Sequence, residues 1–397
     1  MSFENPDARA ILSKGREKSV LNRHPWIFSR GIDAVEGDPE AGSIISVYSK
    51  RNDFLGKAFF NPNSQIRLRM LSFNTSVIDL EYLKNTLVQA NSFRQKNLPA
   101  NTNAYRVVNS ENDLLPGLII DRYNDVLVIQ CNTLGISLLK PHIVEILEEM
   151  FSPAVILERS DSTQGAREGM QPTRSTLVGN IPEQLMIQEN GIAFEIDPVE
   201  GQKTGFFLDQ RDNRQRLANF CNDKNNVLNC FAFTGGFNVY AALKGATTTS
   251  VELSKPAVEM NKRNMIHNKI DPKKHTFICD NVFEYLRKAE KNTFDRIVLD
   301  PPAFAKQRKQ VQKAARGYKD INRLAIEQIK PGGILLTCSC SAAVDADLFQ
   351  KIVYSAAQEA NRAVQIIGRP TQPLDHPTSI FFPEGEYLKT LILRVED

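Results

Sequence analysis

Apolar and polar residues follow three different patterns along the 397-residue chain. Up to about residue 75 the apolar runs are short, as at 44–48 and 66–70, and Gly, Asp, Asn and Pro separate them. Brief alternating runs between turn residues predict short strands. We therefore expect a small β-barrel over residues 1–75.

The middle of the chain combines both periodicities. Helical spacing occurs near 80–93 and 138–150, and strand-like runs stand at 118–121, 126–130 and 154–157. This order predicts a small mixed α/β domain over residues 76–188, whose exit is marked by the Gly-, Asn- and Pro-containing stretch 179–182.

Strand and helix signals alternate regularly over residues 189–397. The candidate strands are 227–231, 249–253, 275–279, 296–299 and 334–337, and the candidate helices lie near 237–244, 255–267, 281–290 and 320–329. Such alternation predicts parallel strands joined by crossover helices. We expect an α/β protein whose C-terminal part is a doubly wound, Rossmann-like sheet.

The composition is that of a globular protein, with 24% charged and 42% apolar residues. A net charge of +3 means that attraction to nucleic acid must come from local clusters of Lys and Arg. Only Cys338 and Cys340 among six cysteines lie close together, and their spacing fits neither a zinc knuckle nor a redox pair. With no signal peptide and no apolar run of ~18 residues, we expect a cytoplasmic protein with reduced thiols, no metal and no membrane contact.

Ligands of open parallel sheets sit beyond the carboxyl ends of the strands. The first predicted strand ends at Asn229 and Phe231, and Thr234, Gly235 and Gly236 follow as a turn that lets the backbone approach a ligand. No dinucleotide or triphosphate motif accompanies the glycines. A plain strand-to-helix turn would explain them equally well.

Acidic residues end the next two strands. Glu252 lies about 20 residues beyond the turn, where an acid accepts the hydroxyls of a ribose, although it could also be a solvated charge. Asp280 and the adjacent Asn281 could hold an adenine amino group, or Asp280 could cap the following helix. Together with the glycine turn, these residues predict S-adenosylmethionine as the cofactor.

A more specific signal is the segment Asp300-Pro301-Pro302-Ala303-Phe304 at the end of the fourth strand. Two prolines remove amide donors, which leaves carbonyl groups and the Asp300 carboxylate to bind the edge of a nucleobase while Phe304 stacks on its face. The alternative is a structural Asp-Pro turn. We favour a substrate loop in which Asp300 also borders the cofactor.

Cys340 follows the next strand. A thiolate that adds to carbon 6 of cytosine turns carbon 5 into a nucleophile able to accept a methyl group. The usual fate of a cysteine is burial as a small apolar residue, and Cys338 points to the same face of a strand. We favour Cys340 as the catalytic nucleophile because it should lie past the strand end.

Two basic segments are candidate RNA contacts, although charge runs are usually just solvated surface. The candidates after the Asp-Pro-Pro loop are Lys306, Arg316 and Lys319. Those near the N-terminus are Arg16, Lys18 and Arg23, among aromatic residues.

The chain resembles the bacterial large-subunit ribosomal RNA cytosine-C5 methyltransferases with an N-terminal PUA domain. The similarity runs nearly end to end, and the segments that carry it are 15–19, 23–29, 113–118, 121–123, 203–211, 228–231, 234–237, 300–302, 317–322 and 339–341. The resemblance implies that segment 203–211 packs over the cofactor with Thr204, Phe207, Asp209 and Arg211 near it, and that Cys340 is the nucleophile.

This resemblance also implies ribosomal RNA as the partner and leaves a homodimer open. A guanine or adenine N-methyltransferase is one rival interpretation, because such an enzyme needs no thiol. A non-catalytic RNA-binding or ribosome-assembly protein is the other.

Overall fold

The computed structural model describes residues 3–74, 77–160, 163–305 and 307–397. It divides into two compact units. The first comprises Met1–Leu185, Pro198–Phe206 and Leu374–Gly385, and the second comprises Met186–Asp197, Phe207–Pro373 and Glu386–Asp397. The chain therefore enters each unit more than once.

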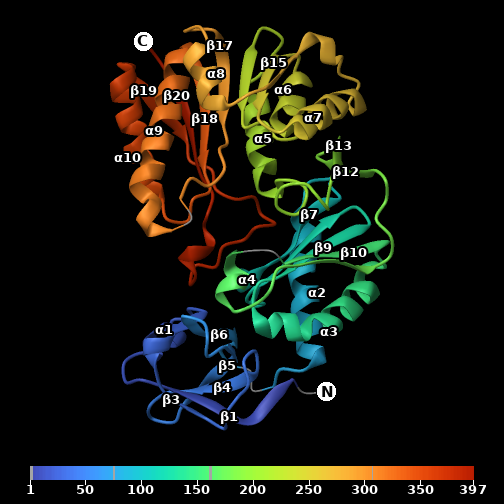
Figure 1. The fold of residues 1–397 in the computed structure, drawn as a ribbon, viewed down its shortest axis with the longest axis vertical. Helices are drawn as coiled ribbons and strands as arrows, with labels where there is room; N and C mark the ends of the chain where they lie inside the picture. Colours follow the sequence, from blue (N-terminus) through green and yellow to red (C-terminus); the bar gives the residue numbers. More distant parts are fainter. Residues whose placement is uncertain (1–2, 75–76, 161–162, 306) are drawn as a thin grey trace. The chain divides into compact units, whose positions relative to one another are not determined.

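The first unit begins with a small β domain, drawn in blue in Figure 1. Its six-stranded sheet has the order β2-β6-β5-β4-β1-β3 and is antiparallel except for the pair β1 and β4. The elements are β1 (Glu4–Leu12), α1 (Glu17–Leu21), β2 (Trp26–Phe28), β3 (Ile32–Glu36), β4 (Ile44–Tyr48), β5 (Phe54–Phe60) and β6 (Ile66–Ser72). Inward-facing residues such as Leu12, Ile45 and Leu68 form a separate apolar core, as the alternating pattern predicts.

A five-stranded sheet with the order β11-β10-β9-β8-β7 completes the first unit. Its strands are β7 (Ala104–Asn109), β8 (Leu118–Tyr123), β9 (Val126–Cys131), β10 (Val155–Ser160) and β11 (Thr173–Val178), and its helices are α2 (Leu80–Asn97), α3 (Leu134–Phe151) and α4 (Thr163–Arg167). Residues of α2 and α3 share one core with the central strands. The mixed α/β prediction is confirmed, but both edge strands were missed. Strand β11 is polar and largely exposed, whereas β7 is mostly buried and polarity does not explain its omission.

A seven-stranded sheet with the order β16-β15-β14-β17-β18-β20-β19 forms the centre of the second unit (Figure 1). The strands are β14 (Asn226–Cys230), β15 (Thr247–Glu252), β16 (Thr276–Cys279), β17 (Phe294–Leu299), β18 (Ile329–Ser339), β19 (Val364–Gly368) and β20 (Lys389–Val395). The first five are parallel, and β20 lies antiparallel between β18 and β19. A hairpin of β12 (Leu185–Glu189) and β13 (Ile192–Ile196) precedes them.

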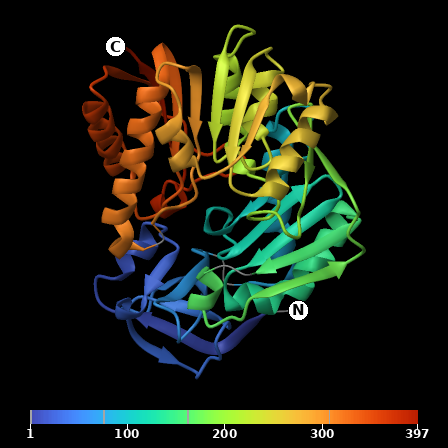
Figure 2. The ribbon, with the colours of Figure 1, turned by 45° about the horizontal axis from the view of Figure 1, so that its top comes forward.

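Helices cover both faces of this sheet. They are α5 (Arg211–Asn219), α6 (Gly236–Ala242), α7 (Lys255–His267), α8 (Val282–Lys288), α9 (Val311–Gln328) and α10 (Ala346–Ala360). Residues of α5 and α6 share a core with one set of strand residues, whereas α8, α9 and α10 pack on another. Figure 2 shows α9 and α10 side by side in orange and red. The doubly wound, Rossmann-like prediction is confirmed.

Two features of the second unit differ from the sequence prediction. Helix α9 begins at Val311 and not near residue 320, because Ala314, Tyr318 and Ile321 already follow helical spacing on its buried side within a basic stretch. The elements β12, β13, α5, α10, β19 and β20 were not predicted, so the antiparallel strand β20 was missed. No helix among the described residues is long and apolar enough to cross a membrane.

Candidate active site at the carboxyl edge of the sheet

The order of the parallel strands reverses between β14 and β17. These neighbours pair from Val227 and Arg296 to Cys230 and Leu299, so their carboxyl ends lie next to each other. The chain continues from β14 to β15 on one side and from β17 to β18 on the other. Loops that leave in opposite directions open a crevice at the strand ends, which is where ligands of such sheets bind.

The loop after β14 has an unusual backbone. Phe231 and Phe233 adopt positive φ angles of 60° and 47°, and Gly235 has a φ of 82°. Left-handed backbone at a non-glycine residue costs about 1–3 kcal/mol and concentrates at functional sites. A Cβ atom on Gly235 would lie 1.9 Å from Asn261 Oδ1, so only glycine fits here. These features go beyond an ordinary strand-to-helix turn.

Glu252 fixes this loop. Its Oε2 accepts a hydrogen bond from the Phe233 amide and its Oε1 accepts one from the Ser254 amide, each at 2.9 Å. The carboxylate is therefore not simply a solvated charge. Each oxygen has a second lone pair, which remains suitable for a ribose hydroxyl.

Asp280 and Asn281, which follow β16, have different capping roles from those expected. The Asn281 side chain caps α8, accepting from the Phe283 amide at 2.9 Å, while Asp280 Oδ1 accepts from the Asn281 amide at 2.7 Å. The alternative in which Asp280 caps the helix is thus wrong. Asp280 is only half-buried.

Asp300 stands at the end of β17, where Gln210 Nε2 donates to its Oδ1 at 2.9 Å. Pro301 is buried and Pro302 is exposed. Phe304 is half-buried and packs on the Tyr318 ring, with 4.6 Å between centroids. The Asp-Pro-Pro loop is therefore anchored at both ends.

Ser341 ties this loop to the end of β18. The Ala305 amide donates to Ser341 Oγ at 3.1 Å, and the Tyr318 hydroxyl lies 2.8 Å from the same atom. Burial raises the pKa of Tyr318, so its phenol stays protonated. The loops after the two neighbouring strands are therefore held together by buried hydroxyl groups.

The two nearby cysteines lie in different surroundings. Cys340 is partly exposed, and its Sγ is 3.9 Å from the carbonyl oxygen of Pro301. Cys338 is fully buried with Sγ 3.5 Å from Thr390 Oγ1, and burial and the nearby Asp300 raise its pKa well above the ordinary value. Cys338 therefore remains a protonated thiol.

Three of the four candidate residues in segment 203–211 belong to the second unit. The Phe207 ring packs edge to face on Phe233, with 5.1 Å between centroids. Asp209 is buried and accepts a 2.8 Å hydrogen bond from the Tyr387 hydroxyl, and Arg211 is completely buried. Phe207 is thus brought to the glycine-containing loop.

Thr204 belongs to the first unit. Its hydroxyl donates to Asp121 Oδ2 at 2.6 Å and lies 2.8 Å from the Tyr123 hydroxyl. Burial raises the pKa of Tyr123. Thr204 is therefore part of a buried hydrogen-bond network of that unit.

The basic residues after the Asp-Pro-Pro loop have different environments. Lys306 lies outside the described residues. Arg316 is exposed on α9, whereas Lys319 forms a 2.6 Å ion pair with Glu359 of α10. Arg316 is therefore the more exposed of the two described residues, and the partly exposed Lys319 already has an acidic partner.

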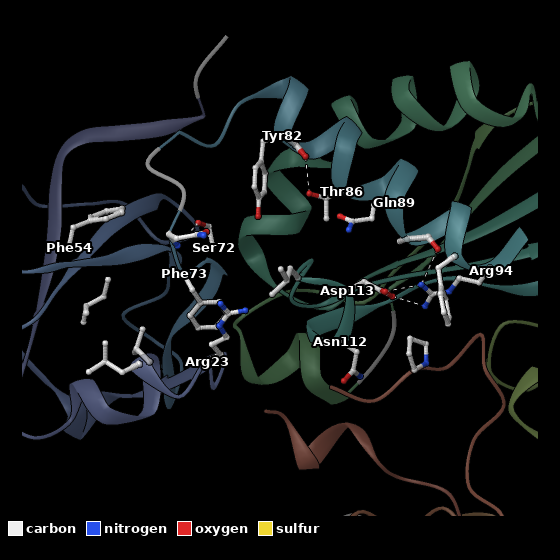
Figure 3. Close-up of a pocket in the computed structure, with 18 residues that line it drawn as sticks. Arg23, Phe54, Ser72, Phe73, Tyr82, Thr86, Gln89, Arg94, Asn112 and Asp113 are labelled. Atoms are coloured by element: carbon white, nitrogen blue, oxygen red, sulfur yellow. Dashed lines mark hydrogen bonds and ion pairs between the residues drawn. The ribbon is translucent and has the colours of Figure 1, made fainter. Parts of the chain in front are cut away.

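The N-terminal basic residues belong to the β domain. Arg16 and Lys18 are exposed at α1. Arg23 lies within a cavity of about 730 Å³ that Phe54, Phe73 and Tyr82 also line, as Figure 3 shows. Cationic and aromatic side chains together are typical of surfaces that bind single-stranded nucleic acid.

Two residues near the site were missed by the sequence reasoning. One is Gln210, which lies between two charged residues at the start of a helix, and an amide in that position is only a weak signal. Lys389 is buried in β20, and a single Lys in the apolar run 388–393 is the signal that could have found it.

Comparison with known proteins identifies two parts of the chain. Residues 10–73 match the model of a PUA-like domain, and residues 167–393 match that of an S-adenosylmethionine-dependent methyltransferase. The Ribosomal RNA large subunit methyltransferase I of Tolumonas auensis is 44% identical over 390 residues, which cover 96% of this chain and 98% of the relative. Its namesake from Vibrio vulnificus is 42% identical, with 98% and 99% covered. This chain belongs to the ribosomal RNA large subunit methyltransferase I family.

Solved structures agree with this family fold. A protein from Streptococcus mutans that is proposed to be a SAM-dependent methyltransferase superposes with a TM-score of 0.82 at 23% identity, covering 97% of this chain and 99% of the other. Another proposed methyltransferase, complexed with SAH, has a TM-score of 0.83 at 23% identity and the same coverage.

The cofactor of this protein is S-adenosylmethionine, and polar residues around β14 are suited to bind it. Thr234 Oγ1 and Asn229 Oδ1 are buried and have no hydrogen-bond partner among the described residues. Buried polar atoms are usually satisfied, so unpaired ones at a ligand crevice point to a bound partner.

Proposed function

We propose that this protein forms 5-methylcytosine in large-subunit ribosomal RNA through a covalent adduct on Cys340. The names of the relatives support ribosomal RNA of the large subunit as the substrate. The observation that carries the choice of cytosine is the approach of Cys340 Sγ to the Pro301 carbonyl oxygen at 3.9 Å. It brings a partly exposed thiol to the loop that begins with Asp300.

Further residues of both units have proposed roles in binding the cofactor or the RNA. Asn229, Phe231, Thr234, Gly235, Gly236, Glu252, Asp280, Asn281 and Asp300 would bind the cofactor, together with Thr204, Phe207, Asp209 and Arg211. Pro301, Pro302, Phe304, Lys306, Arg316, Lys319, Arg16, Lys18 and Arg23 would contact RNA. The limits at residues 75 and 188, a cytoplasmic location and a homodimer stay predictions.

In the proposed reaction the Cys340 thiolate adds to carbon 6 of an extruded cytosine, forming an S–C bond and raising the electron density at carbon 5. Asp300 and the proline carbonyl groups orient the base. The cofactor supplies an electrophilic methyl group that carbon 5 accepts. Loss of the carbon-5 proton returns its bonding pair to the ring, restores the carbon 5–carbon 6 double bond and expels the thiolate.

The covalent step is tested by replacing the thiol. Cys340→Ala should bind S-adenosylmethionine within about twofold of the wild type and lose methylation by more than ~1000-fold, because no other group can activate carbon 5. Binding is measured by calorimetry and methylation by transfer of labelled methyl to ribosomal RNA. Cys338→Ala is the matched control and should remain active. A fully active Cys340→Ala protein would exclude the covalent route.

A modified substrate separates cytosine chemistry from the rival on a purine. RNA with 5-fluorocytosine should trap a protein–RNA adduct only when the cofactor is present, because fluorine replaces the departing proton. The adduct should form with Cys338→Ala and be absent with Cys340→Ala. Methylated guanine or adenine without an adduct would support the N-methyltransferase alternative, and absence of cofactor binding would support a non-catalytic protein.

A further inference from the structure

Lys389 is a buried cation next to the proposed nucleophile. It begins β20 and pairs with Ser339 of β18, the residue just before Cys340. Its side chain is buried, and the two hydrogen bonds of its Nζ go to neutral carbonyl groups. Burying an ammonium group without a countercharge is costly, so its retention in an apolar strand calls for a reason.

Two carbonyl groups fix the position of the Lys389 Nζ. It donates to the Ser341 carbonyl oxygen at 2.9 Å and to the Tyr387 carbonyl oxygen at 2.7 Å. Ser341 directly follows Cys340, so the first of these bonds holds the ammonium group beside the segment that carries the thiol. An ammonium group has three N–H bonds, and one remains for a further acceptor.

From this cluster we infer that Lys389 is the countercation of Cys340, and that its ammonium group stabilises the thiolate that attacks the pyrimidine. Lys389 acts through Cys340 and is therefore a positioning residue. The inference deepens the proposed function and rests on it for the identity of the nucleophile. No proton transfer between the two side chains is required, because the thiol can lose its proton to solvent.

The charges around Lys389 agree with this pairing. Burial lowers the pKa of Lys389, and the negative charges of Cys340, Glu386 and Asp345 act in the opposite direction, with Cys340 first among them. Attraction between two charges is mutual, so a cation that gains from a Cys340 thiolate also favours that thiolate. The other titratable groups near this cluster are the carboxyl groups of Glu386, Asp345 and Asp300, the phenol of Tyr318 and the buried thiol of Cys338. The Asp300 carboxylate opposes a nearby thiolate, and the Lys389 ammonium group offsets this repulsion.

Thiol reactivity tests the inference without RNA. The rate of alkylation of Cys340 by iodoacetamide, followed against pH by peptide mass spectrometry, gives the pH at which half of the thiol is ionised. Cys279 is exposed and serves as an internal reference in every sample. In the wild-type protein the midpoint of Cys340 should lie below that of Cys279, and an equal or higher midpoint would overturn the inference.

Substitutions assign the effect to the charge. Lys389→Met should move the midpoint of Cys340 up by about one pH unit and leave that of Cys279 unchanged, whereas Lys389→Arg should keep the wild-type value. An unchanged midpoint in folded Lys389→Met, checked by thermal melting and cofactor binding, would also overturn it. If Lys389→Met does not fold, the comparison within the wild-type protein still decides.

The outcome is independent of the methylation experiment. If Cys340→Ala methylates RNA while Lys389→Met shifts the thiol midpoint, the covalent route fails and the charge pair stands. If Cys340→Ala is inactive and the midpoint does not move, the route stands and the pair fails.

Discussion

The carboxyl edge of the sheet has two halves that are built differently. We call the loops after β14, β15 and β16 the cofactor half and the loops after β17 and β18 the substrate half. After β15 and β16, polar side chains bind backbone amides. Asn281 binds the nearby Phe283 amide, and Glu252 binds the Ser254 amide and that of Phe233 in the loop after the adjacent strand β14. After β17 and β18, side chains meet partners from remote segments. The examples are Gln210 with Asp300, Ala305 with Ser341, and Lys389 with Ser341.

This difference indicates how each half tolerates change. Local hydrogen bonds form whenever the loop forms, so the cofactor half depends mainly on backbone conformation. Contacts between remote segments form only after the whole sheet is assembled. We therefore expect variants of the cofactor half to change cofactor affinity, and variants of the substrate half to change methylation at nearly constant cofactor affinity.

The largest effect should follow Gly235→Ala. A Cβ atom would lie 1.9 Å from Asn261 Oδ1 at a φ of 82°, so the loop must move. We expect unfolding free energy to fall by about 3 kcal/mol and cofactor affinity to fall by more than ~100-fold. Denaturant titration and calorimetry measure both.

Gly332→Ala is the matched control for Gly235→Ala. Gly332 has a φ of 74° but nothing lies within 4 Å of a Cβ atom there. Its variant should lose about 1 kcal/mol of stability and keep cofactor affinity. Equal losses of affinity in both variants would contradict the importance of the Gly235 contact.

Glu252→Gln should have the next largest effect. The carboxylate accepts two backbone hydrogen bonds, and an amide nitrogen in place of one oxygen cannot accept, so one buried N–H loses its partner. We expect cofactor affinity to fall by about 30-fold, which calorimetry measures, with alkylation of Cys340 unchanged. If the alkylation rate of Cys340 fell together with cofactor affinity, the two halves would be energetically coupled.

Gln210→Ala probes the substrate half. Removing the 2.9 Å donor to Asp300 frees the carboxylate to change orientation. We expect about tenfold slower methylation in single-turnover assays and less than a twofold change in cofactor affinity. Gln215→Ala, at a partly exposed position of the following helix α5, is the control and should match the wild type. A drop confined to cofactor affinity would assign Gln210 to the other half.

The smallest effect concerns a titration at the opposite end of the cofactor half. Burial lowers the pKa of His275, whose Nδ1 lies 3.2 Å from the Thr248 amide and can accept its N–H. The unfolded chain therefore binds a proton more readily, and stability falls as pH drops below about 6.5. His275→Asn should remove this pH-dependent loss of stability. The loss is smaller than about 1 kcal/mol because the ring is half-exposed. Denaturant midpoints at pH 7.5 and 5.5 measure it, and an identical pH dependence in both proteins would refute it.

The same contrast explains what could be predicted from the sequence. The Rossmann-like sheet and the strand-end positions of Glu252, Asp300 and Cys340 follow from local apolar runs and from the general rule on ligand sites. The caps and turns of the cofactor half are local too, although the choice of Asn281 over Asp280 needed the backbone geometry.

The remote contacts could not be predicted in this way. Nothing near Gln210 in the sequence indicates Asp300, and nothing near Lys389 indicates the loop after β18. Their proximity depends on the insertion of β20 between β18 and β19, which the alternation of parallel strands did not suggest. The difference between Cys338 and Cys340 likewise needed the extent of burial.

The late position of β20 in the sequence has a consequence for biosynthesis. During translation the first five strands emerge before Lys389, so a nascent chain can form the cofactor crevice while the thiol at 340 still lacks its neighbouring cation. We expect the order of synthesis to delay nucleophilic reactivity until the ribosome has released the last strand of the sheet.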